Sequence, residues 1–167
     1  MTVVALDLSL TSSGIARADG TCRRVRTGKL RGPERLDFIV REVMASCEGA
    51  DLVVIEGQAF GAQGRAKTGI AELHGAVLLE LWRAMLLTSI VPPTALKKAA
   101  TGSGRAGKDE MVEAARAAGA VVSGHDEADA WWLRQMGLAA LGLEHAIADG
   151  RADYAETIRR GLMAPQQ

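Results

Sequence analysis

The sequence predicts a single α/β domain built on a mixed five-stranded sheet with helices on both faces. The first reason is the order of the elements, which runs three strands, a helix, a strand, a helix, a strand and then only helices. The second is how the strands are joined. A tight Asp19-Gly20 turn, typical of hairpins, links early strands, whereas helix-length segments, typical of parallel crossovers, separate the later ones. Three antiparallel strands followed by two parallel strands are therefore expected.

The first half of the chain shows these elements clearly. The apolar run at 2–8 is typical of a buried strand, and strands at 12–18 and 21–30 follow it around the hairpin. A helix opens at Pro33, and its apolar residues recur at helical spacing as far as Cys47. This half therefore supplies the antiparallel strands and the first covering helix.

The second half alternates strands with helices before it becomes helical. The continuous β-branched run at 51–57 predicts a buried strand, and the glycine-rich segment 58–69 predicts a loop. The remaining expected elements are a helix at 70–87, a short strand at 88–91, helices at 95–100, 108–119 and 126–143, and poorly patterned helix at 144–163. We predict one domain over 1–143 and a helical extension of it over 144–167.

Composition limits the classes of protein that fit. The chain has 167 residues, 48% hydrophobic and 24% charged, as expected for one globular domain. No apolar run approaches the roughly 18 residues of a membrane span, and the first ten residues lack the pattern of a signal peptide. Cys22 and Cys47 do not have the spacing of a disulfide framework or zinc site, so we expect a cytoplasmic protein.

Charge is unevenly distributed although the net charge is zero. Residues 1–57 are neutral, 58–108 carry a net charge of +5, and 109–167 carry a net charge of −5. A polyanion is therefore expected to bind the middle third, unless these charges simply form solvated faces. The basic residues there that we take as DNA-binding candidates are Arg65, Lys67, Lys97, Lys98, Arg105 and Lys108.

The stretch GHDEADAWWL at 124–133 places Asp126 and Asp129 three residues apart at the start of a helix. Residues with this spacing share a helix face, so the two charges repel each other. One interpretation is local: Asp126 is the N-cap, and Asp129 takes the third helical position of a capping box. The other interpretation needs further carboxylates elsewhere in the chain that meet this pair around a cation.

Two apolar strands end on such carboxylates, Asp7 and Glu56. If these strands are parallel neighbours, both acids emerge at the carboxyl edge of the sheet, where open α/β sheets place their sites. A helix that begins near this edge would add Asp126 and Asp129. Four converging carboxylates repel one another strongly, and hard divalent cations prefer such oxygen ligands. The sequence therefore predicts a metal site formed by these four acids.

Four stretches of the chain resemble the successive motifs of RuvC-type Holliday junction resolvases, which have the ribonuclease H-like fold. These stretches are ALDLSLTSSGIA, VVIEGQAF, PPTALKKAATGSGRAGKDEMV and HDEADAWWL, in order over residues 3–133. The loop around Phe60 and residues 144–167 differ from bacterial members, which suggests a divergent, phage-borne relative. The resemblance implies a metal-dependent endonuclease that cuts four-way or other branched DNA and leaves 5′-phosphate ends.

The resemblance also implies individual roles. Asp7, Glu56, Asp126 and Asp129 take the positions of acidic ligands for two Mg²⁺ or Mn²⁺ ions. Lys97 and Lys108 take those of active-site lysines, with Lys108 expected to neutralise charge on the phosphate during catalysis. Phe60 lies near a loop aromatic that inserts at the junction, although it is one residue further from the glutamate than in the family.

Other interpretations remain at this stage. GSGRAGKD at 102–109 fits the G-x-x-x-x-G-K phosphate loop of a small NTPase, but Asp109 replaces the Ser or Thr that binds magnesium, and no strand precedes it. LDLSLTSSG also resembles the first phosphate loop of sugar kinases and actin-like ATPases, which need a second similar half. A non-catalytic branched-DNA-binding or scaffold protein of the same fold is the third alternative. His74, His125 and His145 show no ligand spacing among themselves, although His125 adjoins the acids.

A four-way junction presents two equivalent strands, so a two-fold homodimer is the simplest way to cut both. We expect the apolar faces of the helices at 70–87 and 126–143 to form its interface.

Overall fold

The structure is a computed structural model that describes residues 1–58, 65–143 and 151–163, with the side chains of 65–67 and 151–153 excepted. The strands are β1 Val3–Asp7, β2 Ser12–Ala16, β3 Cys22–Arg26, β4 Leu52–Glu56, β5 Thr88–Val91 and β6 Leu162–Met163. The helices are α1 Gly32–Cys47, α2 Arg65–Arg83, α3 Pro93–Thr101, α4 Lys108–Ala117, α5 His125–Ala140 and α6 Arg151–Arg160.

The strands form one mixed sheet in the order β3-β2-β1-β4-β5-β6. The pairs β1–β2 and β2–β3 are antiparallel, whereas β1–β4 and β4–β5 are parallel. These five strands confirm the predicted sheet. The sixth strand, β6, pairs antiparallel with β5 and was not predicted, because two residues are too short to show an alternating pattern.

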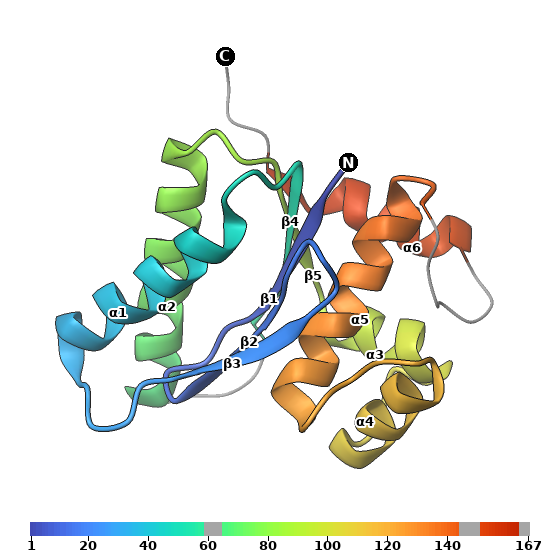
Figure 1. Ribbon diagram of the computed structural model, residues 1–167, viewed down its shortest axis with the longest axis horizontal. Coiled ribbons are helices and arrows are strands. Elements are labelled where there is room, and N and C mark those ends of the chain that lie inside the picture. The colour runs from blue at the N-terminus through green and yellow to red at the C-terminus, as the bar shows by residue number, and fades with distance from the viewer. Residues whose placement is uncertain (59–64, 144–150, 164–167) are drawn as a thin grey trace.

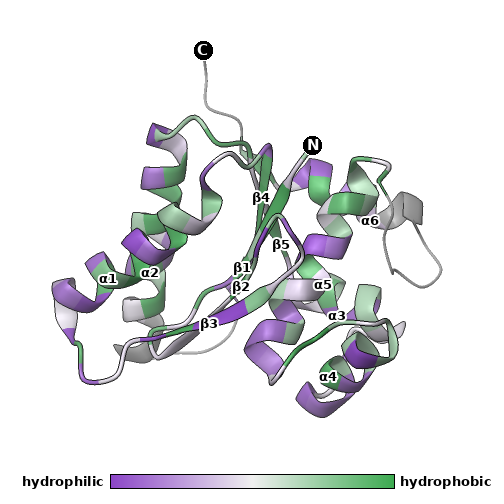
Figure 2. Cartoon of the chain, viewed as in Figure 1, coloured by the Kyte–Doolittle hydropathy of each residue, from purple (hydrophilic) through white to green (hydrophobic). Residues whose placement is uncertain are grey.

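Helices cover both faces of the sheet, as Figure 1 shows: α1 and α2 lie on one side and α3 to α6 on the other. Alternate residues of β1 point to opposite faces. Val4 and Leu6 pack in the cluster under α1 and α2, whereas Val3 and Ala5 pack in the cluster under α5. In Figure 2 the hydrophobic residues accordingly lie along the sheet and the inner faces of the helices.

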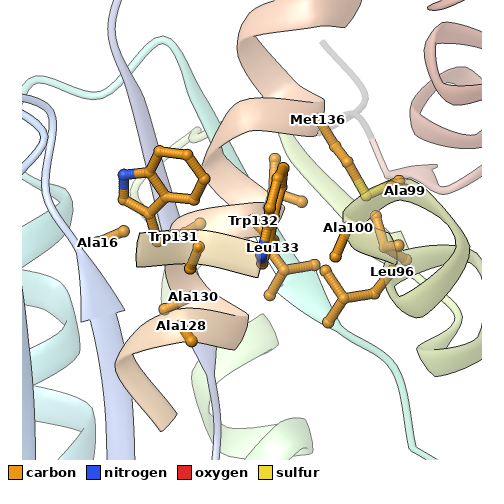
Figure 3. Packing of buried hydrophobic residues seen from close by; sticks show 14 of the residues in the cluster. Ala16, Leu96, Ala99, Ala100, Ala128, Ala130, Trp131, Trp132, Leu133 and Met136 are labelled. Carbon is orange, nitrogen blue, oxygen red and sulfur yellow. The ribbon is translucent and has the colours of Figure 1, made fainter. Parts of the chain in front are cut away.

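Helix α5 lies at the centre of the second layer, and much of it is buried within the chain. Its Trp131 and Trp132 rings contact each other edge to face at 4.8 Å. In Figure 3 they lie between Ala16 of β2 and the α3 residues Leu96 and Ala100. The prediction that α5 offers an apolar face to a second subunit is therefore wrong, because that face completes the core of a single chain.

Two glycines allow α5 to lie directly on the sheet. A Cβ atom on Gly137 would stand 2.7 Å from Val3 Cγ1, and one on Gly14 would stand 1.8 Å from the backbone oxygen of Asp126. Neither position accommodates a side chain while the helix and the sheet keep this approach. The contact at Gly14 fixes the first turn of α5 against β2.

Helix α2 begins at Arg65, five residues before the predicted start. Gly69, which favoured a loop, lies inside this helix, where a Cβ atom would stand 2.9 Å from Leu10 Cδ1. The glycine therefore serves close packing rather than a turn. None of the helices in the described ranges is long and apolar enough to cross a membrane.

The described part of the C-terminal segment packs on the rest of the chain. Tyr154 and Ile158 of α6 are buried in the same core cluster as α5. The Tyr154 hydroxyl donates to the backbone oxygen of Lys98 at 3.2 Å, and Ser89 Oγ donates to that of Ile158 at 2.8 Å. Helix α6 therefore covers the β5 side of the sheet.

Candidate active site

The sheet places the first two acids side by side. Strands β1 and β4 are parallel and pair Leu6 with Ile55, so Asp7 and Glu56 both emerge at the carboxyl ends of adjacent strands. Their carboxyl groups hydrogen-bond to each other, and this close pairing is possible because the pKa values of both groups are raised. The structure therefore places these two acids side by side at the sheet edge, as the sequence predicted.

The first turn of α5 brings the other two acids to the same place. Asp126 accepts a hydrogen bond from Ser12 Oγ at 2.6 Å, and its other oxygen lies 3.2 Å from His125 Nε2. Asp129 lies one helical turn further on and is close enough to raise the pKa values of both Asp7 and Glu56. Residues far apart in sequence are therefore gathered at one point.

The local interpretation of Asp126 as a helix cap is wrong. Helix α5 begins at His125 and its N-cap is Gly124, so Asp126 already lies inside the first turn. Glu127 instead holds the segment just before the helix, because its Oε2 accepts hydrogen bonds from the backbone N–H and the hydroxyl of Ser123. Asp126 caps no backbone N–H of the helix and lines the pocket.

All four acids line one open pocket of about 890 Å³. Its floor is the carboxyl edge of β1 and β4, and its walls come from β2, β3, α2, α3, α4 and α5. The polar residues that share the pocket with the four acids are Ser9, Thr11, Ser12, Arg24, Arg26, Gln58, His74, Lys97, Lys108 and His125.

Burial and repulsion between the acids raise the pKa values of Asp7, Glu56 and Asp129. Burial, followed by the charges of Glu56, Asp129 and Asp126, raises the pKa of Asp7 well above its usual value. Burial and then Asp129 raise the pKa of Glu56 to about 7, and burial raises that of Asp129 to about 6. Full ionisation of these acids is therefore unfavourable unless a cation compensates their charge.

Two of the predicted basic residues reach the acids. Lys97 on α3 and Lys108 at the start of α4 line the pocket, and their charges lower the pKa of Asp129. Lys97 also lowers that of Glu56. Lys98 and Arg105 are exposed and do not line this pocket. Phe60 and the side chains of Arg65 and Lys67 lie outside the described residues.

The donor set fits a hard divalent cation, because it consists of carboxylate oxygens in a pocket open to solvent. Across the described ranges, however, no three Asp, Glu, His or Cys side chains already have the arrangement of a metal site. Asp7 and Glu56 bond to each other and Asp126 bonds to Ser12, so these oxygens face protein partners. A cation bound by Asp7 and Glu56 would have to break the hydrogen bond between their carboxyl groups.

The structure does not support a phosphate loop at GSGRAGK. This segment connects α3 to α4, whereas such a loop must follow a strand. Lys108 begins α4 and lies in the acidic pocket, and its neighbour Asp109 is exposed.

Several residues of the pocket were missed by sequence reasoning. Arg24 and Arg26 belong to a segment of zero net charge, so the charge distribution did not mark them. Ser12 is one of several hydroxyl residues in its segment, and nothing local distinguishes it. His74 is buried on α2 and lines the pocket, where burial lowers its pKa. Of these residues, only Arg24 and Arg26 could have been found from the sequence, because two residues that are two positions apart on an expected strand share one face of the sheet.

A sheet of this order, with three antiparallel strands, two parallel strands and helices on both faces, defines the ribonuclease H-like class. No family model and no curated protein matches the sequence. Among solved structures, Thermus thermophilus RuvC aligns with a TM-score of 0.67 and 23% identity, over 85% of this chain and 97% of that one. T. thermophilus RuvC in complex with a Holliday junction substrate aligns with a TM-score of 0.65 and 23% identity, over 80% and 90%. The chain thus has the fold of RuvC, which confirms the fold that the resemblance implied.

Proposed function

We propose that this protein is a metal-dependent, structure-specific endonuclease that resolves four-way DNA junctions by hydrolysing phosphodiester bonds. The observation that carries the proposal is the convergence of Asp7, Glu56, Asp126 and Asp129 in one pocket. The similarity to RuvC, one structure of which contains a Holliday junction substrate, supports the choice of DNA. Other branched DNAs are further candidate substrates.

The four acids are proposed to hold two Mg²⁺ or Mn²⁺ ions. Bound there, such ions would activate a water and stabilise the leaving 3′ oxygen of a phosphodiester. Asp7 lies on the central strand of the sheet and interacts with the other three acids, so it is the best candidate to contact both ions. Glu56, Asp126 and Asp129 would complete the ligand set around it.

The two lysines of the pocket are proposed to act on the DNA backbone. Lys97 and Lys108 place two positive charges beside the acids. Lys108 would neutralise charge that develops on the phosphate, because an ammonium acts as a point charge without a fixed geometry. Lys98 and Arg105, which are exposed outside the pocket, would contact phosphates further away.

The active form is proposed to be a homodimer, since two pockets are needed to cut two equivalent strands. Of the two helices expected to form the interface, α5 is largely buried, whereas α2 has exposed apolar residues. Leu79 and Trp82 on α2 and Met85 just after it are 46%, 55% and 56% exposed. We name these three residues the α2 surface and propose that it forms the interface.

A cleavage assay tests the proposed function. Labelled four-way junction, flap and linear duplex are each incubated with the protein in Mg²⁺, in Mn²⁺ and in EDTA. We expect paired cuts in the junction, only with metal, leaving 5′-phosphate ends that DNA ligase can rejoin. Asp7→Asn should lower the cleavage rate at least roughly a hundredfold while junction binding remains.

The same assay separates the alternatives. Junction binding without cleavage in either metal would favour a non-catalytic branched-DNA-binding protein. Equal cutting of the linear duplex would contradict structure specificity. Full activity of Asp7→Asn would remove that residue from the proposed ligands.

A further inference from the structure

Strand β3 forms a second basic side of the pocket. Arg24 and Arg26 both line it, and they pair in register with Gly14 and Ser12 of β2. Alternate residues of β3 point to the opposite face: Val25 is buried under α1 and α2, and Arg23 contacts Glu42 of α1. The two arginines therefore share the face on which α5 and the acids lie.

The two basic sides flank the acids. In the strand order, β3 is at one edge, β1 and β4 with Asp7 and Glu56 are in the middle, and β5 lies beyond them. Lys97 is on α3, which follows β5 directly. A DNA strand that crosses the acids from Lys97 would therefore continue towards β3.

The two arginines differ in what they already bind. The Arg24 guanidinium lies 3.2 Å from Glu127 Oε1 and donates to Ser123 Oγ at 3.1 Å, so it is held at the start of α5. Arg26 is exposed, and its side chain makes no hydrogen bond or ion pair with the residues that the structure describes. Because Arg26 is exposed and also lines the pocket, its guanidinium can reach a ligand that enters from solvent.

We propose that Arg26 binds a backbone phosphate of the DNA on the β3 side of the acids, across from Lys97. This inference rests on the proposed function. A guanidinium presents a planar fork of donors that matches phosphate oxygens, and the hydroxyls of Ser9 and Thr11 line the same wall. Two basic sides would hold a polyanion over a floor that otherwise repels it. Arg24 instead positions the start of α5 through Glu127.

The test measures junction binding over a range of salt concentrations in the Asp7→Asn background with Mg²⁺, so that no cutting intervenes. Arg26→Ala should weaken binding roughly tenfold at low salt, and it should reduce the slope of log K against log salt by about 0.9, as expected for one lost phosphate contact. Arg26→Lys should keep the slope while losing part of the affinity.

The matched control is Arg17→Ala, which removes an exposed arginine at the opposite end of the same hairpin. We expect its affinity and salt slope to equal those of the parent. If Arg26→Ala also equals the parent while the parent binds junctions, the inference fails and the proposed function stands. If the parent does not bind branched DNA at any salt concentration, both fail.

Discussion

At the scale of single residues, the site depends on carboxyl groups held in an environment that disfavours their charge. Glu56 and Asp129 have pKa values of about 7 and 6 because burial outweighs the help of the nearby lysines. Such perturbed acids in a pocket are typical of functional sites. Their positions at strand ends and in a helix turn were predictable from the sequence, whereas their protonation depends on packing that only the fold supplies.

The raised pKa values predict how stability depends on pH in the absence of metal. The folded chain keeps the proton of Glu56 up to about pH 7, but the unfolded chain releases it near the ordinary value of 4.5. The folded state therefore binds more protons between these values, and the free energy of unfolding falls as pH rises through this window.

Replacing Glu56 should remove this penalty. We expect Glu56→Gln to stabilise the metal-free protein by roughly 2 kcal/mol at pH 8 and by much less at pH 4.5. Urea unfolding in EDTA at the two pH values measures the difference. Glu72→Gln, which changes an exposed acid on α2, is the control and should show no such pH dependence. A stabilisation by Glu56→Gln that is equal at both pH values would contradict this account.

Ser12 is expected to position Asp126 for metal binding. Its hydroxyl donates to Asp126 Oδ2, and partners of this kind orient metal ligands. Ser12→Ala should raise the Mg²⁺ concentration that gives half-maximal cleavage roughly 10- to 100-fold, with little change in rate at saturating metal. Ser12→Thr keeps the hydroxyl and should restore the metal dependence, whereas equal effects of both variants would indicate a loss of folding only.

At the scale of elements, α5 is the piece that assembles the site. It carries two of the four acids and lies on the sheet through Gly14 and Gly137. The sequence predicted this helix to within a few residues because its acids and apolar run are distinctive. The sequence left open whether its apolar residues face the core or a partner, because a helix that is apolar on most sides fits both, and the structure places Trp131 and Trp132 in the core.

A side chain at Gly14 should displace α5 from the sheet. The Cβ of Gly14→Ala would overlap the backbone oxygen of Asp126, and neither backbone can move freely. We expect a loss of roughly 1–3 kcal/mol in the free energy of unfolding, together with a loss of cleavage. Chemical denaturation measures the first and the junction assay the second.

Gly75→Ala is the matched control for this substitution. Gly75 lies on α2, where a Cβ atom meets nothing within 4 Å. Alanine is the better helix former there, so we expect a gain of roughly 0.5–1 kcal/mol. A neutral effect of Gly14→Ala beside this gain would show that α5 adjusts without strain.

At the scale of the whole molecule, the strand topology could be predicted from the sequence, but the contacts between distant segments could not. The five main strands are where hydrophobic runs and turns predicted them, since each pattern is local. Strand β6 and the two basic sides of the pocket depend on contacts between distant segments. For the same reason, the overall charge distribution identified Lys97 and Lys108 but gave no indication of Arg26.

The proposed dimer is tested at the α2 surface. Trp82→Glu places a charge in the centre of the three exposed apolar residues and should convert a dimer into a monomer in sedimentation experiments. Single cuts in the junction should then replace paired cuts. Val121→Glu is the control, because Val121 is 94% exposed and lies outside α2. A monomeric parent with paired cutting would contradict the dimer.

The dispersal of the four acids also has a consequence for protein synthesis. Asp7 is synthesised with the first strand and Glu56 with the fourth, but Asp126 follows Glu56 only after another seventy residues. Until α5 docks beside Gly14, a growing chain can hold Asp7 beside Glu56 but lacks the other two acids of the pocket. The complete acidic pocket therefore forms only after α5 has been synthesised and has docked on the sheet.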